Sequence, residues 1–301
     1  ITKPLRQTLL FDALVETLGG RKRAVDSNFE KVTSQAQRTR RSQVRLLVGE
    51  DNSINLRLVT LMLNKLGYVA DVAGNGIEVL QALKRQSYDV ILMDVQMPEM
   101  DGVEATRQIR RSEKHQPYII ALTANVLPDD RKLYTAAGMN AFLAKPLTTD
   151  ELESALAEAM ENIGIERNDR TATMAEPAIA ASSALILLDE RRVHEILDLT
   201  RDAGDNVFGE MIEHLHVDIA ELNSQLDSGD DIDPAAFMRS AHSLKGASRS
   251  LGAQALGHLY EDLERLGKAA DFVEFKRRVR ESDALVERSL DALRKYASKS
   301  L

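Results

Sequence analysis

Asp94 is the first residue of this sequence whose setting suggests chemistry. It follows the apolar run VILM at 90–93 and precedes a turn that contains Pro98 and the pair Asp101-Gly102. A carboxylate is costly to bury unless it is paired or bound to a metal. A buried parallel strand that ends in aspartate therefore places that carboxylate at the carboxyl edge of the sheet, where open α/β sheets bind ligands.

Two further carboxylates, Glu50 and Asp51, follow the mostly apolar segment at 44–48. In a doubly wound sheet the first and third strands are neighbours at the point where the strand order reverses, so we expect these carboxylates to converge with Asp94. Three carboxylates share one site only if a cation lies between them. Because every ligand is an oxygen, the expected cation is Mg²⁺.

A hydroxyl and an ammonium group are expected at the same edge. Thr123 ends the fourth predicted strand, and Lys145 ends the fifth, directly before Pro146. Taken alone, Thr123 is interpreted as a strand-end residue and Lys145 as a surface lysine. At successive strand ends the two suit a phosphoryl group on Asp94. Mg²⁺ and Lys145 would neutralise its oxygens, and Thr123 would hydrogen-bond one of them.

The segment around these residues alternates between strand and helix patterns. Apolar runs predict strands at 44–48, 69–73, 90–94, 118–123 and 141–145. Amphipathic runs predict helices at 55–66, 76–85, 103–111, 129–137 and 149–162. Five such units within residues 44–164 predict an α/β domain with a doubly wound, five-stranded parallel sheet.

These residues together resemble the receiver domain of two-component response regulators, which has a flavodoxin-like fold. The resemblance covers residues 44–163 and rests on Glu50-Asp51, Asp94, Pro98, Asp101-Gly102, Thr123-Ala124 and Lys145-Pro146. It implies that Asp94 accepts a phosphoryl group from a phosphohistidine.

The same resemblance implies the roles of several neighbours. Mg²⁺ would be held by Asp51, Asp94 and the backbone carbonyl of Gln96, with Glu50 acting through water. Phe142 would occupy an aromatic switch position. Glu50 stands where many members have aspartate. Its longer arm changes the reach of the carboxylate and not its charge.

A second chemical candidate is His242, in a helical stretch nearer the carboxyl end of the chain. On a helical wheel the apolar residues of 237–251 define a buried face, and His242 lies roughly 140° from the first of them, on the solvent side. Lys245 and Arg249 lie beside it, and cations there would stabilise an attached phosphoryl group. Gly246 follows one turn on. A glycine in the middle of a helix destabilises the helix by about 1 kcal/mol relative to alanine. Such a glycine is expected where another surface must approach the helix closely.

The string AHSLKGASRSLGA at 241–253 resembles histidine phosphotransfer (HPt) domains, whose motif is H-x-x-K-G. The resemblance covers about residues 186–298 and implies a four-helix bundle in which His242 is phosphorylated. Lys245 and Gly246 occupy their motif positions. Alignment with the family suggests that a side chain on the next helix orients the imidazole, and Glu264 is the candidate. For a single exposed histidine, the alternative is an ordinary solvated side chain.

Three other segments complete the domain organisation. Residues 1–19 contain Lys3-Pro4-Leu5, which aligns with Lys145-Pro146-Leu147, and we expect the last helix of a preceding receiver-like domain there. Residues 20–43 are expected to be a basic linker; contact with anionic lipid or nucleic acid is the less favoured alternative. Residues 165–185, rich in Ala, Ser and Thr, are expected to be a flexible linker before the HPt region at 186–301.

Composition limits the other classes of function. The 301 residues carry a formal net charge of −8 and no cysteine, so thiolate metal sites are excluded and nucleic-acid binding is not expected. The sequence has no run of about 18 apolar residues and no recognisable signal peptide, so we expect a cytoplasmic fragment without membrane contact.

A receiver followed by an HPt domain resembles the C-terminal part of a bacterial hybrid sensor histidine kinase, whose parent chain would be anchored in the inner membrane. The implied partners are an upstream histidine kinase core and a separate downstream response regulator. The implied reaction is a phosphorelay from that core to Asp94, then to His242, then to the regulator. Glycine-rich nucleotide-binding boxes are absent from the sequence, so this fragment should transfer phosphoryl groups without using ATP. Whether it is itself an enzyme is left open, whereas the parent would be a transferase.

Two other classes of function stay open. An Asp–Mg²⁺ phosphatase usually needs a second aspartate two residues after the first, and Gln96 stands at that position. A binding scaffold with vestigial phosphorylation is disfavoured by the intact Asp94, Lys145 and His242.

Overall fold

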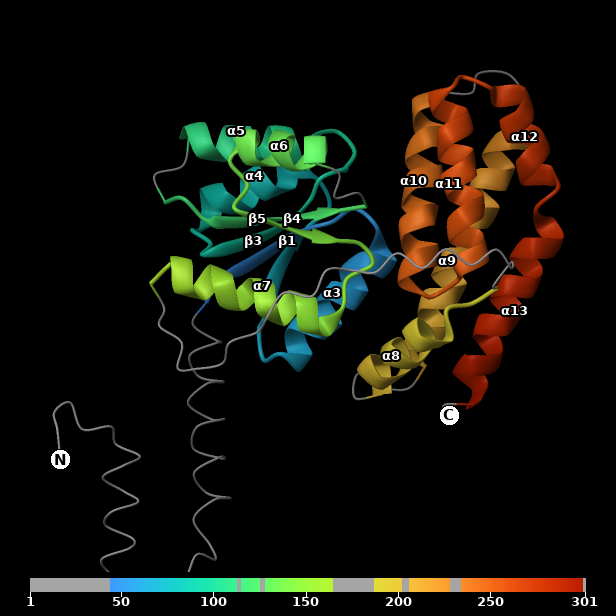
Figure 1. Cartoon of the computed structure of the whole chain (residues 1–301), viewed down its shortest axis with the longest axis horizontal. Coiled ribbons are helices and arrows are strands. Elements are labelled where there is room, and N and C mark those ends of the chain that lie inside the picture. The colour runs from blue at the N-terminus through green and yellow to red at the C-terminus, as the bar shows by residue number, and fades with distance from the viewer. Residues whose placement is uncertain are drawn as a thin grey trace, which may run out of the picture. The chain divides into compact units, whose positions relative to one another are not determined.

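The structure, a computed structural model, describes residues 44–112, 115–124, 128–164, 187–201, 206–227 and 234–299 (Figure 1). These residues form an α/β domain and a helical domain, so the predicted fold class is confirmed. The segments predicted as a helix remnant at 1–19 and as linkers at 20–43 and 165–185 lie outside the described residues.

A parallel sheet of five strands forms the first domain, in the order β2-β1-β3-β4-β5. The strands are β1 (Leu46–Gly49), β2 (Ala70–Ala73), β3 (Val90–Asp94), β4 (Tyr118–Thr123) and β5 (Ala141–Ala144). β3 lies at the centre and pairs with β1 on one side and with β4 on the other. The prediction that the first and third strands are neighbours is therefore confirmed.

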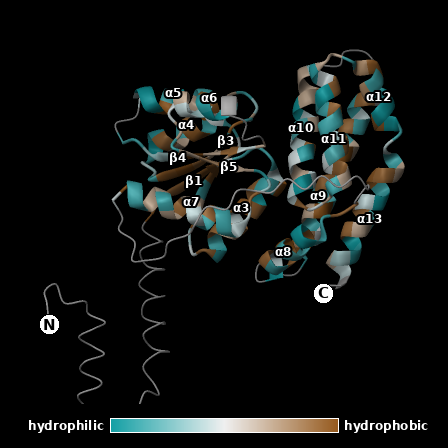
Figure 2. Cartoon of the chain, in the orientation of Figure 1, coloured by the Kyte–Doolittle hydropathy of each residue, from teal (hydrophilic) through white to brown (hydrophobic). Residues whose placement is uncertain are grey.

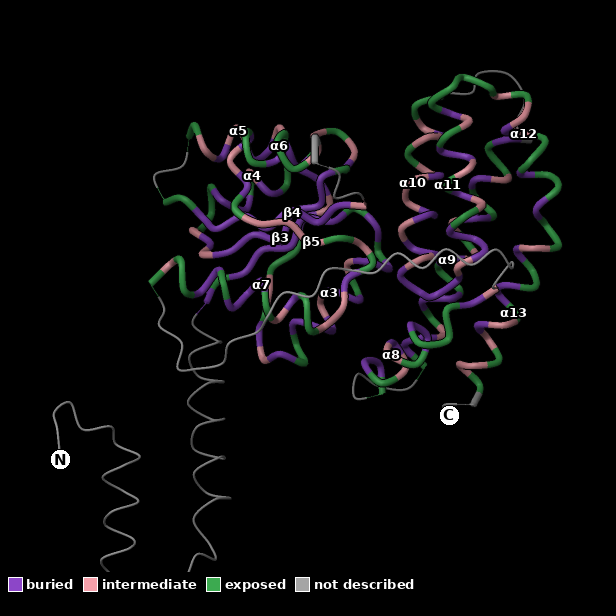
Figure 3. Tube along the Cα trace, in the orientation of Figure 1, coloured by how far each residue is buried: buried purple, intermediate pink, exposed green. Residues whose placement is uncertain are grey.

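Five helices cover the two faces of this sheet. They are α3 (Ser53–Lys65), α4 (Gly76–Arg85), α5 (Gly102–Ser112), α6 (Pro128–Ala137) and α7 (Thr149–Asn162). Figure 1 shows α3 and α7 on one face and α4, α5 and α6 on the other. Because successive strand side chains point to opposite faces, Leu46 and Val48 pack with α3 and α7, and Leu47 packs with α4, α5 and α6. The inner strands β1, β3 and β4 are mainly apolar in Figure 2 and buried in Figure 3, as parallel strands covered on both faces require. The edge strands β2 and β5 are mostly half-buried or exposed.

Several element ends differ from the predicted bounds by one or two residues. α3 begins at Ser53 rather than at residue 55 because the side chain of Asn52 caps the helix by accepting bonds from two backbone N–H groups of its first turn. β1, β2, α5 and α6 are shifted by similar amounts. β5 ends at Ala144, so Lys145 lies just beyond the strand instead of being its last residue.

The second domain is built from helices. They are α8 (Glu190–Thr200), α9 (Val207–Asp227), α10 (Pro234–Ser250), α11 (Gln254–Lys268), α12 (Phe272–Arg280) and α13 (Asp283–Lys299). The apolar stripe of α9, from Phe208 to Leu226, is buried. α10 contacts α9 and α11, and α12 and α13 each contact α9 and α11. The predicted four-helix bundle is therefore present. Three of its helices are α9, α10 and α11, and α12 and α13 together form the fourth.

A tight turn makes an antiparallel hairpin of α10 and α11. Gly252 in this turn has a φ of +79°, a left-handed conformation that glycine adopts at low cost. A Cβ at this position would lie 2.9 Å from a methyl carbon of Val193 and 3.0 Å from the backbone oxygen of Asp189. The turn therefore holds the carboxyl end of α10 close to the start of α8.

Candidate functional site

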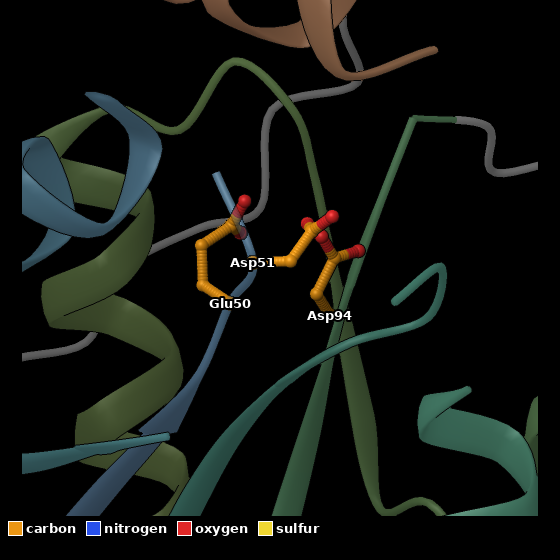
Figure 4. Close-up of side chains that lie close together, drawn as sticks. All are labelled: Glu50, Asp51 and Asp94. Carbon is orange, nitrogen blue, oxygen red and sulfur yellow. The ribbon is translucent and has the colours of Figure 1, made fainter. Parts of the chain in front are cut away.

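The three predicted carboxylates converge at the carboxyl edge of the sheet (Figure 4). Glu50 and Asp51 follow β1, and Asp94 ends β3. One carboxylate oxygen of each residue lies within 4.8 Å of the oxygens of the other two. Glu50 and Asp94 are buried, whereas Asp51 is exposed to solvent. The cluster therefore has an open side at Asp51.

Lys145 joins the two buried carboxylates. Its Nζ lies 2.6 Å from Oε2 of Glu50 and 2.6 Å from Oδ2 of Asp94. Burial by itself would lower the pKa of this ammonium group, but Asp94 and Glu50 outweigh burial and hold the pKa above its usual value. Lys145 is thus kept charged at the position where the sequence predicted a cation.

The chain around Asp94 is packed so tightly that it fixes the carboxylate. All five residues of β3 are buried. The backbone N–H of Gln96 donates to Oδ1 of Asp94 at 3.2 Å. At Gly102 a Cβ would lie 2.0 Å from the backbone oxygen of Asp94, so a larger residue does not fit there. The predicted turn therefore folds back directly against the strand end.

Asn55, for which no role was predicted, also contacts the cluster. Its Nδ2 donates to Oε1 of Glu50 at 3.0 Å, while Lys145 binds the other oxygen of the same carboxylate. Glu50 is therefore held at both oxygens. A buried amide in the first turn of α3, five residues after Glu50, was the signal that could have identified it.

Mg²⁺ fits this set of donors. The three carboxylates offer only oxygen ligands, which magnesium prefers. Burial raises the pKa of the Asp94 carboxyl; Lys145 opposes that rise and Glu50 adds to it. Positive charge at the cluster would therefore favour the ionised form of Asp94.

Thr123 and Phe142 both lie beside α6. The Oγ1 of Thr123, at the end of β4, lies 3.1 Å from the phenolic oxygen of Tyr134, and both groups are buried. Phe142 is half-buried on β5, and the guanidinium carbon of Arg131 lies 4.6 Å from the centroid of its ring. Neither Tyr134 nor Arg131 was singled out from the sequence.

His242 in the helical domain faces a carboxylate. It lies on α10 with its side chain 23% exposed, and its Nδ1 is 3.4 Å from Oε1 of Glu264 on α11. The expected partner on the next helix is therefore adjacent to the imidazole. With the proton on Nδ1 facing this carboxylate, the lone pair of Nε2 is available for chemistry.

Lys245 and Arg249, expected beside His242 on the solvent side of the helix, instead pair with carboxylates of α11. The ammonium group of Lys245 is buried and bonds to Oε2 of Glu264. Arg249 pairs with Oε2 of Glu261 at 2.9 Å. Lys245 lies at the edge of the buried helix face, where a carboxylate from α11 offers it a partner. Both cations are therefore engaged with α11, while Gly246 is half-buried on α10.

Glu264 receives hydrogen bonds from three side chains. Lys268 Nζ donates to its Oε1 at 2.7 Å, in addition to the contacts of His242 and Lys245. Burial would raise the pKa of this carboxyl, but the hydrogen bonds of His242, Lys245 and Lys268 outweigh burial and hold the pKa well below its usual range. Glu264 is thus a stable anion next to the imidazole.

None of the described helices is both long and apolar enough to cross a membrane. The family model described as "Response regulator receiver domain" matches residues 46–157, and the model described as "Hpt domain" matches residues 206–296. The first match includes all residues of the acid–lysine cluster, which are Glu50, Asp51, Asp94 and Lys145. The second match includes His242 and Glu264.

Two relatives are similar to this chain in sequence. The hybrid signal transduction histidine kinase K of Dictyostelium discoideum is 42% identical over 127 residues, which are 40% of this chain and 10% of that protein. The aerobic respiration control sensor protein ArcB of Escherichia coli O157:H7 is 30% identical over 225 residues, 73% of this chain and 27% of that protein. The chain thus spans a minor part of the length of both.

A similar solved structure is the receiver domain of the sensor histidine kinase PA1611 from Pseudomonas aeruginosa PAO1, which was crystallised with a magnesium ion coordinated in its active site cleft. It is 42% identical, covers 40% of this chain and 98% of its own, and has a TM-score of 0.37. The two family matches show that this chain contains a response regulator receiver domain followed by an Hpt domain.

Proposed function

We propose that Asp94 accepts a phosphoryl group from an upstream phosphohistidine and passes it to His242, which passes it to a separate response regulator. The main support is the cluster of three carboxylates and one lysine at the ends of β1, β3 and β5. The upstream donor is a histidine kinase core, in the same chain or in another. By resemblance, the parent protein is anchored in the inner membrane, with these domains in the cytoplasm.

In the first transfer a carboxylate oxygen of Asp94 attacks the phosphorus, and the N–P bond of the donor breaks with its electron pair returning to the imidazole. Asp51, Asp94 and the backbone carbonyl of Gln96 would hold Mg²⁺, which would supply positive charge to the phosphoryl oxygens. Lys145 binds a second phosphoryl oxygen, and the hydroxyl of Thr123 donates a hydrogen bond to a third. Glu50 keeps Lys145 in place and would act on the metal through water.

In the second transfer Nε2 of His242 attacks the phosphorus of the acyl phosphate. The O–P bond breaks, and its electron pair stays on the Asp94 carboxylate. The ring gains positive charge, which Glu264 stabilises from the Nδ1 side. Gly246, without a side chain, leaves room for the receiver surface that carries the phosphoryl group.

The stability of the bound phosphate in acid and in alkali distinguishes the two carriers. The full chain is incubated with Mg²⁺ and a radiolabelled, autophosphorylated histidine kinase core. Wild type should accumulate acid-labile, alkali-stable phosphate, the property of phosphohistidine. His242→Gln should retain alkali-labile phosphate, and Asp94→Asn should carry none. Chelation of Mg²⁺ should have the same effect as Asp94→Asn.

Two exposed residues supply matched controls: His258→Gln on α11 and Asp150→Asn on α7 should behave as wild type. Labelling of Asp94→Asn would show that the acceptor assignment is wrong. Identical phosphate chemistry in wild type and in His242→Gln would show that phosphate does not move from Asp94 to His242.

A further inference from the structure

Helix α6 contacts two residues of the receiver: Thr123, which the proposed function places at a phosphoryl oxygen, and Phe142, which occupies the aromatic switch position implied by the resemblance to receivers. Tyr134 bonds through its hydroxyl to Thr123 at 3.1 Å, and the Arg131 guanidinium lies 4.6 Å from the ring centroid of Phe142. Arg131 and Tyr134 are three residues apart, so they lie on the same side of the helix. Since side chains alternate along β4, Thr123 shares a sheet face with Ile119 and Ala121, which pack in the same apolar cluster as Tyr134.

We propose that Tyr134 and Arg131 are positioning residues that hold the receiver in its unphosphorylated arrangement and release Thr123 and Phe142 when Asp94 is phosphorylated. The inference rests on the proposed function, because it needs an acyl phosphate on Asp94 toward which Thr123 moves. Each of the two α6 residues acts through another side chain of the receiver: Tyr134 through Thr123, and Arg131 through Phe142.

The hydrogen bond between Tyr134 and Thr123 is important because both hydroxyl groups are buried. Tyr134 is 5% exposed and Thr123 is 3% exposed, so water does not readily replace either partner. A buried hydroxyl without a partner costs free energy. When Thr123 turns to a phosphoryl oxygen, the Tyr134 hydroxyl must find a new partner, and α6 must move to provide one. Phosphorylation at the strand end is thereby coupled to the position of α6.

Arg131 adds a second contact that favours the same arrangement. It is exposed, and its guanidinium lies over a Phe142 ring that is half-buried. A cation over an aromatic ring is attracted by the negative face of the ring. If Phe142 turns inward, that contact is lost. Both contacts therefore stabilise the unphosphorylated state, and removal of either one should make the phosphorylated arrangement easier to reach.

Affinity for a phosphoryl mimic tests the proposal on the full chain. Beryllofluoride is titrated in the presence of Mg²⁺, and binding is followed by fluorine NMR. Tyr134→Phe removes only the hydroxyl, and we expect beryllofluoride to bind about two- to tenfold more tightly, the equivalent of one ordinary hydrogen bond. Tyr118→Phe is the matched control, because its hydroxyl lies 3.4 Å from Glu158 at the opposite end of β4. Its affinity should equal that of wild type.

The effect should depend on the partner residue. In a Thr123→Ala background, Tyr134→Phe should leave the affinity unchanged, since no hydroxyl remains to be released. Likewise, Arg131→Gln should tighten binding in the wild-type chain and have no effect in a Phe142→Leu background. Unchanged or weaker binding in Tyr134→Phe, or the same gain in the Thr123→Ala background, would overturn the proposal. Failure of wild type to bind beryllofluoride, with Asp94→Asn behaving alike, would instead overturn the proposed function on which it rests.

Discussion

Replacement of Glu264 by glutamine should destabilise the helical domain in a pH-dependent way. The carboxylate is buried between α10 and α11 and bonds to Lys245, Lys268 and His242. Glutamine keeps nearly the same shape but removes the negative charge. The substitution therefore tests whether the charge of Glu264, rather than its packing, holds the two helices and the imidazole in place.

The magnitude follows from how deeply each partner is buried. The Lys245 side chain is 9% exposed, whereas that of Lys268 is 60% exposed. A hydrogen bond to a charged group contributes about 1.5–3 kcal/mol, and an exposed ion pair contributes at most about 1 kcal/mol. We expect Glu264→Gln to lower the free energy of opening of α10 and α11 by about 2–4 kcal/mol at neutral pH. Most of that loss comes from leaving the Lys245 charge without a carboxylate.

The dependence on pH has a definite sign. The pKa of Glu264 is lowered in the folded chain, so its contribution is fully present above the unfolded pKa of about 4.3 and is lost as the pH falls toward the folded pKa. The difference between wild type and Glu264→Gln should therefore be constant from neutral pH down to about pH 5 and shrink below about pH 4.

Amide hydrogen exchange in α10 and α11 of the full chain measures this quantity and separates it from the unfolding of the sheet domain. The matched control is Glu261→Gln, on the same helix and paired with Arg249 but 51% exposed. Glu261→Gln should lower the free energy of opening by less than about 1 kcal/mol. Equal losses in the two variants, or a Glu264→Gln difference that persists unchanged into acid, would refute the reasoning.

Two further substitutions test the packing around the carboxylates. Gly102→Ala should lower the free energy of unfolding, measured by urea denaturation, by about 1–3 kcal/mol. The reason is that the alanine Cβ would lie 2.0 Å from the backbone oxygen of Asp94. Gly74→Ala, with nothing nearer than 3.5 Å, is its control, and an equal loss there would contradict the argument. Asn55→Leu removes the hydrogen-bond donor to Glu50 and should lower the free energy of unfolding by about 1–3 kcal/mol. The same variant should bind Mg²⁺ more weakly, as measured by calorimetry. Asn64→Leu, exposed on the same helix, should leave Mg²⁺ affinity unchanged; an equal weakening would count against a role for the amide.

The sequence was sufficient to predict where a polar group follows a buried apolar run. Asp94 and Thr123 each end such a run, and both lie at the strand ends where the pattern placed them. The alternation of strands and helices then predicted which of these ends are neighbours. Local pattern was enough here because burial of a parallel strand on both faces leaves a continuous apolar signature.

Contacts between residues far apart in the sequence could not be predicted in this way. Lys245 falls at the boundary of its helix face, and its burial depends on a carboxylate 19 residues away on another helix. Tyr134 has the periodicity of an ordinary core residue, and the hydroxyl it binds lies on a neighbouring strand. A helical wheel describes one helix, and the partner that decides burial belongs to another.

The sequence separations within the two sites give them different folding requirements. Lys145 lies 95 residues from Glu50 and 51 residues from Asp94, so the acid–lysine cluster is complete only when the first and last strands of the sheet are both in place. His242 and Glu264 are 22 residues apart and need only the hairpin of α10 and α11. Long-range contacts carry a greater loop-closure cost and form more slowly than local ones. Detachment of β5 alone would therefore abolish the aspartate site, whereas the histidine site keeps its geometry for as long as one helical hairpin persists.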